Sequence, residues 1–208
     1  MVSLNRHLTE NVLRRYLPRE IIDKILARRE NFQFDTEKRQ ITLMFTDLSG
    51  FTALSQNLGA ARVAEVLNQY LNGMIEILAS NGATIDKFMG DGIMAFWGAP
   101  SELSATEQAE KACNAAVQMH QELNDMNQEW GKTGIPELKI RVGLHHGEAI
   151  VGSFGNAKRS DYTAIGPAVN LTARIESVCI PGQIFISKEL SGFIAEDESE
   201  VVGNFELK

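Results

Sequence analysis

The sequence predicts an α+β domain built on the ferredoxin-like order βαββαβ. Three observations support this. An apolar run over 41–47 has the pattern of a buried strand, and the following stretch keeps its apolar side chains on one helical face as far as Leu78. Two further apolar stretches meet at Gly90-Asp91-Gly92, the pattern of a tight hairpin. We expect an antiparallel or mixed sheet with its helices on one face.

The remaining elements follow in order along the chain. Strands are predicted near 83–88 and 92–97, and a second long helix spans about 105–130. Alternating apolar residues predict a strand over 138–145, and 147–154 returns as another strand. Beyond this core we expect an extra C-terminal helix and strands: a helix over 167–177, an extended segment at 183–187 and a last strand over 200–207.

The first 39 residues differ in composition from the rest. Apolar residues between Asn11 and Arg28 recur at roughly helical spacing, interrupted by Pro18, and a polar stretch follows. We interpret 1–39 as a helical lead-in and linker, and 40–208 as the main domain. An ordinary N-terminal helix packed on that domain fits the pattern equally well.

Composition narrows the functional class. The chain has 208 residues, 44% of them hydrophobic, and a net charge of −7, which argues against a nucleic-acid-binding surface. Cys113 and Cys179 stand far apart and are expected to be reduced structural thiols. No apolar run approaches the roughly 20 residues of a membrane span, and no signal peptide opens the chain. We therefore expect a cytoplasmic location and no membrane contact by this fragment.

Two aspartates stand where chemistry is expected. Asp47 closes the first strand, and Asp91 occupies the hairpin turn. Carboxylates on neighbouring strand ends can hold hard cations such as Mg²⁺, with substrate phosphate filling the rest of the coordination shell. Taken singly, either aspartate would be interpreted as a helix cap or a turn residue.

Four sequence blocks then occur in a recognisable order. They are FTDLSGFT (45–52), DKFMGD (86–91), RVGLHHG (141–147) and GPAVNLTAR (166–174). Together they resemble the catalytic domain of class III nucleotidyl cyclases, the adenylate and guanylate cyclase family, over about residues 40–208. The bicarbonate-responsive adenylate cyclases of bacteria and cyanobacteria look closest, because of SDYTAIGP (160–167). The fold implied is the nucleotide cyclase fold.

The resemblance implies an intramolecular reaction, in which the ribose 3′-oxygen attacks the α-phosphorus and pyrophosphate leaves. Such a step needs charge neutralisation and alignment. Asp47 and Asp91 resemble the family's ligands for two divalent cations, Mg²⁺ or Mn²⁺, with the backbone carbonyl of Leu48 completing the set. The residues implied in binding the triphosphate are Ser49, Gly50, Phe51, Thr52 and, at the end of the chain, Lys208.

Asn170 and Arg174 are implied as the catalytic pair. Their spacing of four residues puts both side chains on one face of a helix. In the family, the asparagine orients the ribose and the arginine meets negative charge developing on the α-phosphate. A guanidinium suits this role because it offers several fixed donors and stays charged.

Lys87 and Thr163 resemble the pair that reads the purine edge. An ammonium can donate to N1 of adenine, and a hydroxyl can accept from N6. Family members that prefer GTP often place Glu where Lys87 stands, so Lys87 favours ATP. Thr163 discriminates less, because a hydroxyl both donates and accepts.

The family assembles its sites between two antiparallel subunits, one giving the metal aspartates and the other the purine readers with the Asn/Arg pair. This chain holds both sets, so a homodimer with two equivalent sites is implied. A sensor domain in the full-length protein is also expected. Alternatives are a guanylate cyclase with the same machinery and a catalytically silent dimerisation or nucleotide-binding module. A diguanylate-forming transferase shares the core, but its Gly-Gly-Asp-Glu-Phe signature is absent.

The RVGLHHG block contains three further polar residues, Arg141, His145 and His146. Arg141 begins the predicted fourth strand and is either structural or lines the phosphate side. His145 and His146 are interpreted as strand-end histidines near the dimer seam, because no cluster of metal ligands accompanies them.

Overall fold

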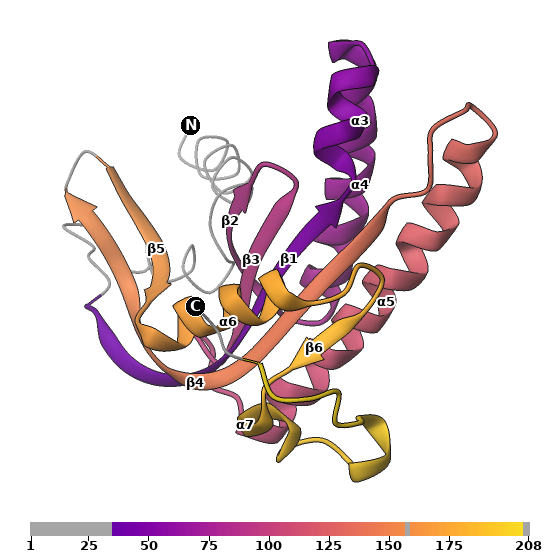
Figure 1. Ribbon diagram of the computed structural model, residues 1–208. Helices are drawn as coiled ribbons and strands as arrows, with labels where there is room; N and C mark the ends of the chain where they lie inside the picture. The colour runs from indigo at the N-terminus through magenta and orange to yellow at the C-terminus, as the bar shows by residue number, and fades with distance from the viewer. Residues whose placement is uncertain (1–34, 157–158, 206–208) are drawn as a thin grey trace.

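The computed structural model describes residues 35–156 and 159–205, and the predicted βαββαβ order is confirmed (Figure 1). The core elements are β1 Glu37–Ser49, α3 Phe51–Asn57, α4 Ala60–Ser80, β2 Thr84–Met89, β3 Gly92–Trp97, α5 Ala105–Gly131 and β4 Lys139–Asn156. The helical stretch predicted after β1 is two helices, because the chain leaves helical geometry at Leu58 and restarts after Gly59. The predicted lead-in falls largely outside the described residues.

The C-terminal part contains one strand that the sequence analysis did not predict, β5 Arg159–Ile165. Its other elements are α6 Pro167–Val178, β6 Ile184–Ile186, α7 Lys188–Ser191 and the 3-10 turn η1 Glu196–Glu198. The predicted helix over 167–177 and extended segment at 183–187 are confirmed. The last strand expected over 200–207 is not found in its described part, 200–205.

The sheet is mixed, as predicted. Its order is β2-β3-β1-β4-β5, and β6 pairs with β4 as a sixth strand. Every pairing is antiparallel except that of β4 with β6, which is parallel. β2 and β5 therefore form the two ends of the main strand order. None of the helices among the described residues is both long and apolar enough to cross a bilayer.

The prediction of two strands over 138–145 and 147–154 was wrong, because β4 runs unbroken through both. Gly147 does not turn the chain; it pairs with Ile41 within the continuous β1–β4 ladder. A Cβ at this position would lie 2.6 Å from His145 Nε2 and 3.2 Å from the Ala168 side chain. The glycine therefore serves close packing between the strand and α6.

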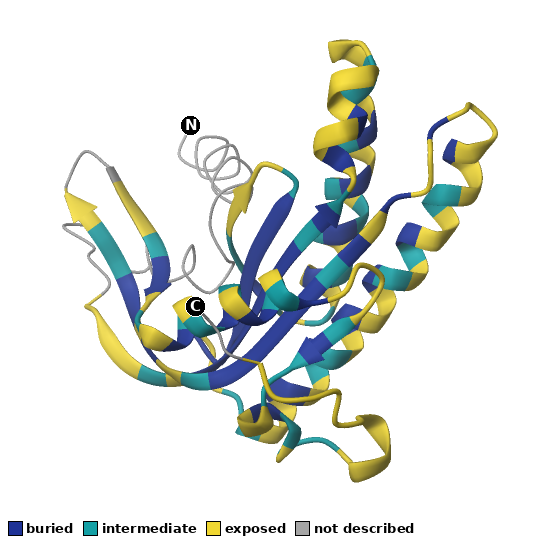
Figure 2. Cartoon of the chain, viewed as in Figure 1, coloured by how far each residue is buried: buried dark blue, intermediate teal, exposed yellow. Residues whose placement is uncertain are grey.

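The helices cover both faces of the sheet, so the expectation of a single covered face was also wrong. Side chains of α4 and α5, such as Tyr70 and Met119, pack with Met44 of β1 in one core cluster. Ala168 of α6 packs with Leu43 in a second cluster on the alternate side chains of β1. Figure 2 shows the buried residues concentrated along the central strands, since β1 is buried from both sides.

Gly143 allows α6 to lie directly on β4. A Cβ at Gly143 would lie 2.4 Å from the backbone nitrogen of Glu176 and 2.7 Å from its Cα. Backbone atoms of a packed helix cannot move aside as a flexible side-chain end can. The helix α6, which carries Asn170 and Arg174, can therefore lie this close to the sheet only because residue 143 has no side chain.

We predict that Gly143→Ala lowers the free energy of unfolding by about 2 kcal/mol, the usual range for overpacking a core. Denaturant unfolding at one fixed protein concentration measures this. Gly131→Ala is the matched control, because nothing lies within 4 Å of a Cβ added at this helical position; its stability should stay equal or rise slightly. Equal stability of Gly143→Ala and the original chain would contradict the close seating of α6.

Candidate active site

The structure brings Asp47 and Asp91 to the same end of the sheet. β1 pairs with β3 up to Thr46 opposite Ile93, so the end of β1 lies beside the β2–β3 turn that holds Asp91. The backbone N–H of Leu48 donates to Asp91 Oδ2 at 3.2 Å. Burial, followed by the field of Asp47, raises the pKa of Asp91. Two carboxylates placed this way at one end of the sheet form a donor set that suits a hard cation.

The described residues contain no group of three or more His, Cys, Asp and Glu side chains placed to hold a metal ion. Two carboxylates are present, so any cation here takes its remaining ligands from backbone oxygen, water or substrate phosphate. Mg²⁺ is commonly held in this way, through one or two carboxylates together with phosphate oxygens. The residues therefore fit the divalent cations that the sequence implied.

Arg141 is paired with the first of these aspartates. It stands directly opposite Asp47 in the β1–β4 ladder, and its Nη2 lies 2.5 Å from Asp47 Oδ2. On its other side, Arg141 Nε lies 3.2 Å from Glu176 Oε1, an ion-pair contact without hydrogen-bond geometry. Burial, partly offset by Arg141, raises the pKa of Glu176. Sequence reasoning missed Glu176, which has no motif to mark it.

The turn after β1 has the predicted strand-glycine-helix form. Gly50 takes a φ of +91°, which glycine adopts without strain, and it precedes the first residue of α3. Leu48 and Phe51 are buried on either side of it, so the turn is anchored by apolar packing. Ser49 and Thr52 flank this turn along the chain. Lys208 lies outside the described residues.

Lys87 and Thr163 meet although they come from strands at the two ends of the sheet order. Lys87 Nζ of β2 donates to Thr163 Oγ1 of β5 at 3.2 Å. The curvature of the sheet brings these strands together (Figure 1). A third side chain, Asp86, completes the contact: its Oδ2 accepts from the Thr163 hydroxyl at 2.5 Å. Sequence reasoning gave no role to Asp86, although it stands beside Lys87.

Asn170 and Arg174 lie one turn apart on α6, as their spacing predicted, and both are exposed. The opposite face of α6 is buried through Ala168, Thr172 and Ile175. The pair therefore points away from the core of its own chain.

His145 and His146 lie in the middle of β4 and are buried, so their interpretation as strand-end residues was wrong. His145 Nδ1 lies 2.8 Å from Ser187 Oγ, and His146 Nδ1 lies 2.9 Å from Thr42 Oγ1. Burial lowers the pKa of both imidazoles. Their hydrogen bonds and their burial give both histidines a structural role.

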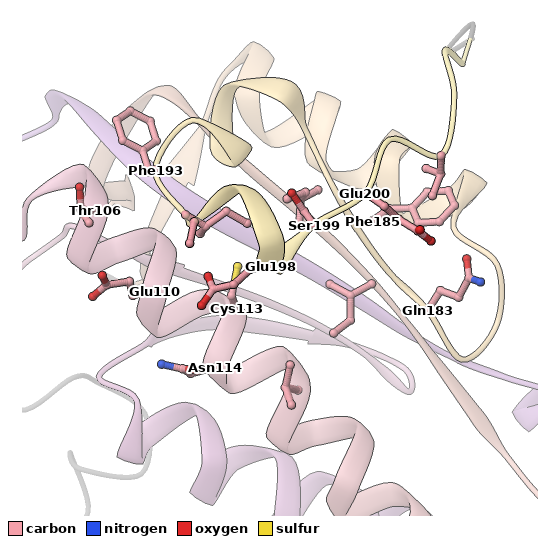
Figure 3. A pocket seen from close by; sticks show the side chains of 16 residues that line it. Thr106, Glu110, Cys113, Asn114, Gln183, Phe185, Phe193, Glu198, Ser199 and Glu200 are labelled. Carbon is pink, nitrogen blue, oxygen red and sulfur yellow. The ribbon is translucent and has the colours of Figure 1, made fainter.

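A groove of about 910 Å³ lies elsewhere, between α5 and the C-terminal segment (Figure 3). It contains none of the candidate site residues. Cys113 lines it, and burial raises the pKa of this thiol to about 11, so the thiol stays protonated at neutral pH.

Known proteins share both sequence and fold with this chain. Residues 34–208 match the family model of the adenylate and guanylate cyclase catalytic domain. Adenylate cyclase 1 of Rhizobium meliloti is 34% identical over 78% of this chain and 24% of its own length. The adenylate cyclase of Anabaena cylindrica is 33% identical over 85% of this chain and 35% of its own length. The chain thus spans about a quarter to a third of these relatives.

Solved structures agree with the sequence comparison. The adenylyl cyclase CyaB from P. aeruginosa has a TM-score of 0.75 and 41% identity, over 76% of this chain and 82% of that one. The guanylyl cyclase Cya2 has a TM-score of 0.74 and 39% identity, over 83% of this chain and 85% of that one. Sequence, fold and the placement of Asp47 and Asp91 at one end of the sheet lead to one conclusion: the chain belongs to the adenylate and guanylate cyclase catalytic domain family.

Proposed function

We propose that this chain is an adenylate cyclase catalytic domain, which converts ATP to 3′,5′-cyclic AMP and pyrophosphate. Similar proteins include both adenylyl and guanylyl cyclases, so similarity alone does not choose between ATP and GTP. The observation that favours ATP is the contact between Lys87 and Thr163. An ammonium beside a hydroxyl offers a donor for N1 and an acceptor for the N6 amine of adenine. Guanine presents the opposite pattern at these positions.

In the proposed site, Asp47, Asp91 and the backbone carbonyl of Leu48 hold two divalent cations, Mg²⁺ or Mn²⁺. When bound, these cations neutralise phosphate charge and activate the attacking 3′-oxygen. The backbone of Ser49 to Thr52 and the side chain of Lys208 bind the triphosphate.

The chain's own α6 residues act on the reacting groups. Asn170 orients the ribose, so that its 3′-oxygen faces the α-phosphorus. Arg174 donates to the α-phosphate oxygens as the new P–O bond forms and the bond to pyrophosphate breaks. The proton of the 3′-hydroxyl leaves to solvent.

We further propose that each site is shared across a homodimer. The exposure of Asn170 and Arg174 supports this, because their side chains are not committed to their own core. Apolar side chains are also exposed near both ends of the sheet: Phe88 and Met89 on β2, and Ile150 and Ile165 where β4 and β5 pair. Each is 42–46% exposed, and covering them by a second chain would be favourable.

A guanylate cyclase is the second candidate, since a guanylyl cyclase is 39% identical and a threonine hydroxyl can also donate. A silent module is the third, and only turnover distinguishes it. Product formation from ATP and GTP, alone and in competition, with Mn²⁺ and then Mg²⁺, tests the assignment directly. Dominant cyclic AMP supports the proposal, and dominant cyclic GMP contradicts it.

Asp47→Asn and Asp91→Asn should each lower kcat by about a hundredfold or more, because each removes an anionic ligand for the cations. Each variant should also bind Mn²⁺ more weakly in an equilibrium titration, a readout that does not depend on turnover. Asp197→Asn, an exposed aspartate in η1, is the control and should match the original chain. Full activity in either variant would contradict the metal assignment.

Inactive Asp47→Ala and Arg174→Ala chains should regain activity when mixed. One of the two sites in each heterodimer is then intact, so random pairing gives about a quarter of the original rate. Mass spectrometry of the intact dimers provides the control that heterodimers formed. No recovery in their presence would count against shared sites.

Lys87→Glu should lower the ratio of kcat/KM for ATP over GTP by about tenfold or more. A carboxylate accepts from N1–H and N2–H of guanine but cannot donate to N1 of adenine. Initial rates with each nucleotide measure the ratio. An increase in preference for ATP would refute the assigned role of Lys87.

A further inference from the structure

Asp86 lies immediately before Lys87 on β2, and its side chain is only 1% exposed. Its Oδ2 accepts from the Thr163 hydroxyl at 2.5 Å and from the Ala164 backbone N–H at 3.3 Å. Its Oδ1 lies 3.2 Å from Lys87 Nζ, an ion-pair contact without hydrogen-bond geometry. One buried carboxylate thus contacts both of the residues that are proposed to read the purine.

We propose that Asp86 determines base specificity by fixing the direction of the Thr163 hydroxyl, an inference that rests on the proposed cyclase function. A threonine hydroxyl has one proton and two lone pairs, and it rotates to suit its neighbours. It could serve either purine if its proton were free. The neighbouring groups therefore decide which purine it accepts.

The contacts assign the hydroxyl proton. In the short bond between the two side chains, the Thr163 hydroxyl is the donor and Asp86 Oδ2 is the acceptor, so this bond uses the hydroxyl proton. The other acceptor within reach, the Ala164 carbonyl, is more distant at 3.4 Å. With its proton held by Asp86, Thr163 presents only lone pairs elsewhere.

The remaining groups match adenine. One lone pair of Thr163 accepts from Lys87 at 3.2 Å, which leaves one for an incoming donor such as the N6 amine. The ammonium of Lys87 has three donors and gives one to Thr163, so donors remain for N1 of adenine. Guanine would place its O6 acceptor against the Thr163 lone pair and its N1–H donor against the ammonium. Asp86 is a positioning residue, because it contacts Thr163 and Lys87 and not the base itself. In this proposal its effect on base choice comes from the direction that it gives the Thr163 hydroxyl.

The test uses the full chain and the ratio of kcat/KM for ATP over GTP. Asp86→Asn should lower the ratio by about tenfold, because an amide offers the hydroxyl both N–H and C=O and releases its direction. Thr163→Val, which removes the hydroxyl, should lower it similarly. In the double variant, Asp86→Asn should change the ratio by less than about twofold relative to Thr163→Val alone.

Three further variants serve as references. Thr163→Ser keeps the hydroxyl and should keep the ratio within about twofold. Asp125→Asn makes the same chemical change on the exposed face of α5 and should leave the ratio unchanged. Asp86→Ala should lower the ratio as Asp86→Asn does, and it allows the test if the amide variant folds poorly. Equilibrium binding of non-hydrolysable ATP and GTP analogues gives the same comparison without turnover.

The outcomes separate this inference from the proposed function. An original chain that prefers GTP would overturn the adenylate cyclase assignment and this inference with it. An original chain that prefers ATP, with the same ratio in Asp86→Asn, would overturn only the role of Asp86. Equal loss of activity toward both nucleotides would likewise reduce Asp86 to a structural residue.

Discussion

The antiparallel pairing of β1 with β4 is the constraint on which the candidate site depends. It runs from Glu37 opposite Val151 to Ser49 opposite Lys139, and this register places Asp47 opposite Arg141. A shift by one residue would turn every side chain of β1 to the other face of the sheet. Because both faces of β1 are covered by helices, such a shift would also disturb two core clusters at once.

This register also sets which charged side chains surround Asp47 and Asp91. Arg141 lies between Asp47 and Glu176, so a single guanidinium contacts two carboxylates from different elements. Asp91 has no such close partner in the described structure, and burial together with the charge of Asp47 raises its pKa. Negative charge at the end of β1 is therefore only partly balanced by the protein itself. This residual charge is what attracts divalent cations to carboxylate sites.

Local sequence patterns predicted most helices and strands and the motif residues. They could not predict contacts between segments that are far apart in the sequence. The spacing of Asn170 and Arg174 and the turn at Asp91 could be predicted because each depends on a few neighbouring residues. The continuity of β4 through Gly147 was missed, because a glycine is needed there for close packing against the side chains of His145 and Ala168, and Ala168 belongs to a helix further along the chain. The apolar run of β1 could not show that both of its faces are covered. The bond between Asp86 and Thr163 spans 77 positions and depends on sheet curvature, which no periodicity records.

The tie between β2 and β5 has a consequence for redesign. Asp86 of β2 links the two outermost strands of the main strand order, because it accepts hydrogen bonds from the Thr163 side chain and the Ala164 backbone, both in β5. The atoms that we propose to determine base choice therefore also join β2 to β5. A substitution at Asp86 would therefore change base selectivity and the contact between β2 and β5 together. A variant redesigned for another nucleotide needs a different interaction to hold these two strands together.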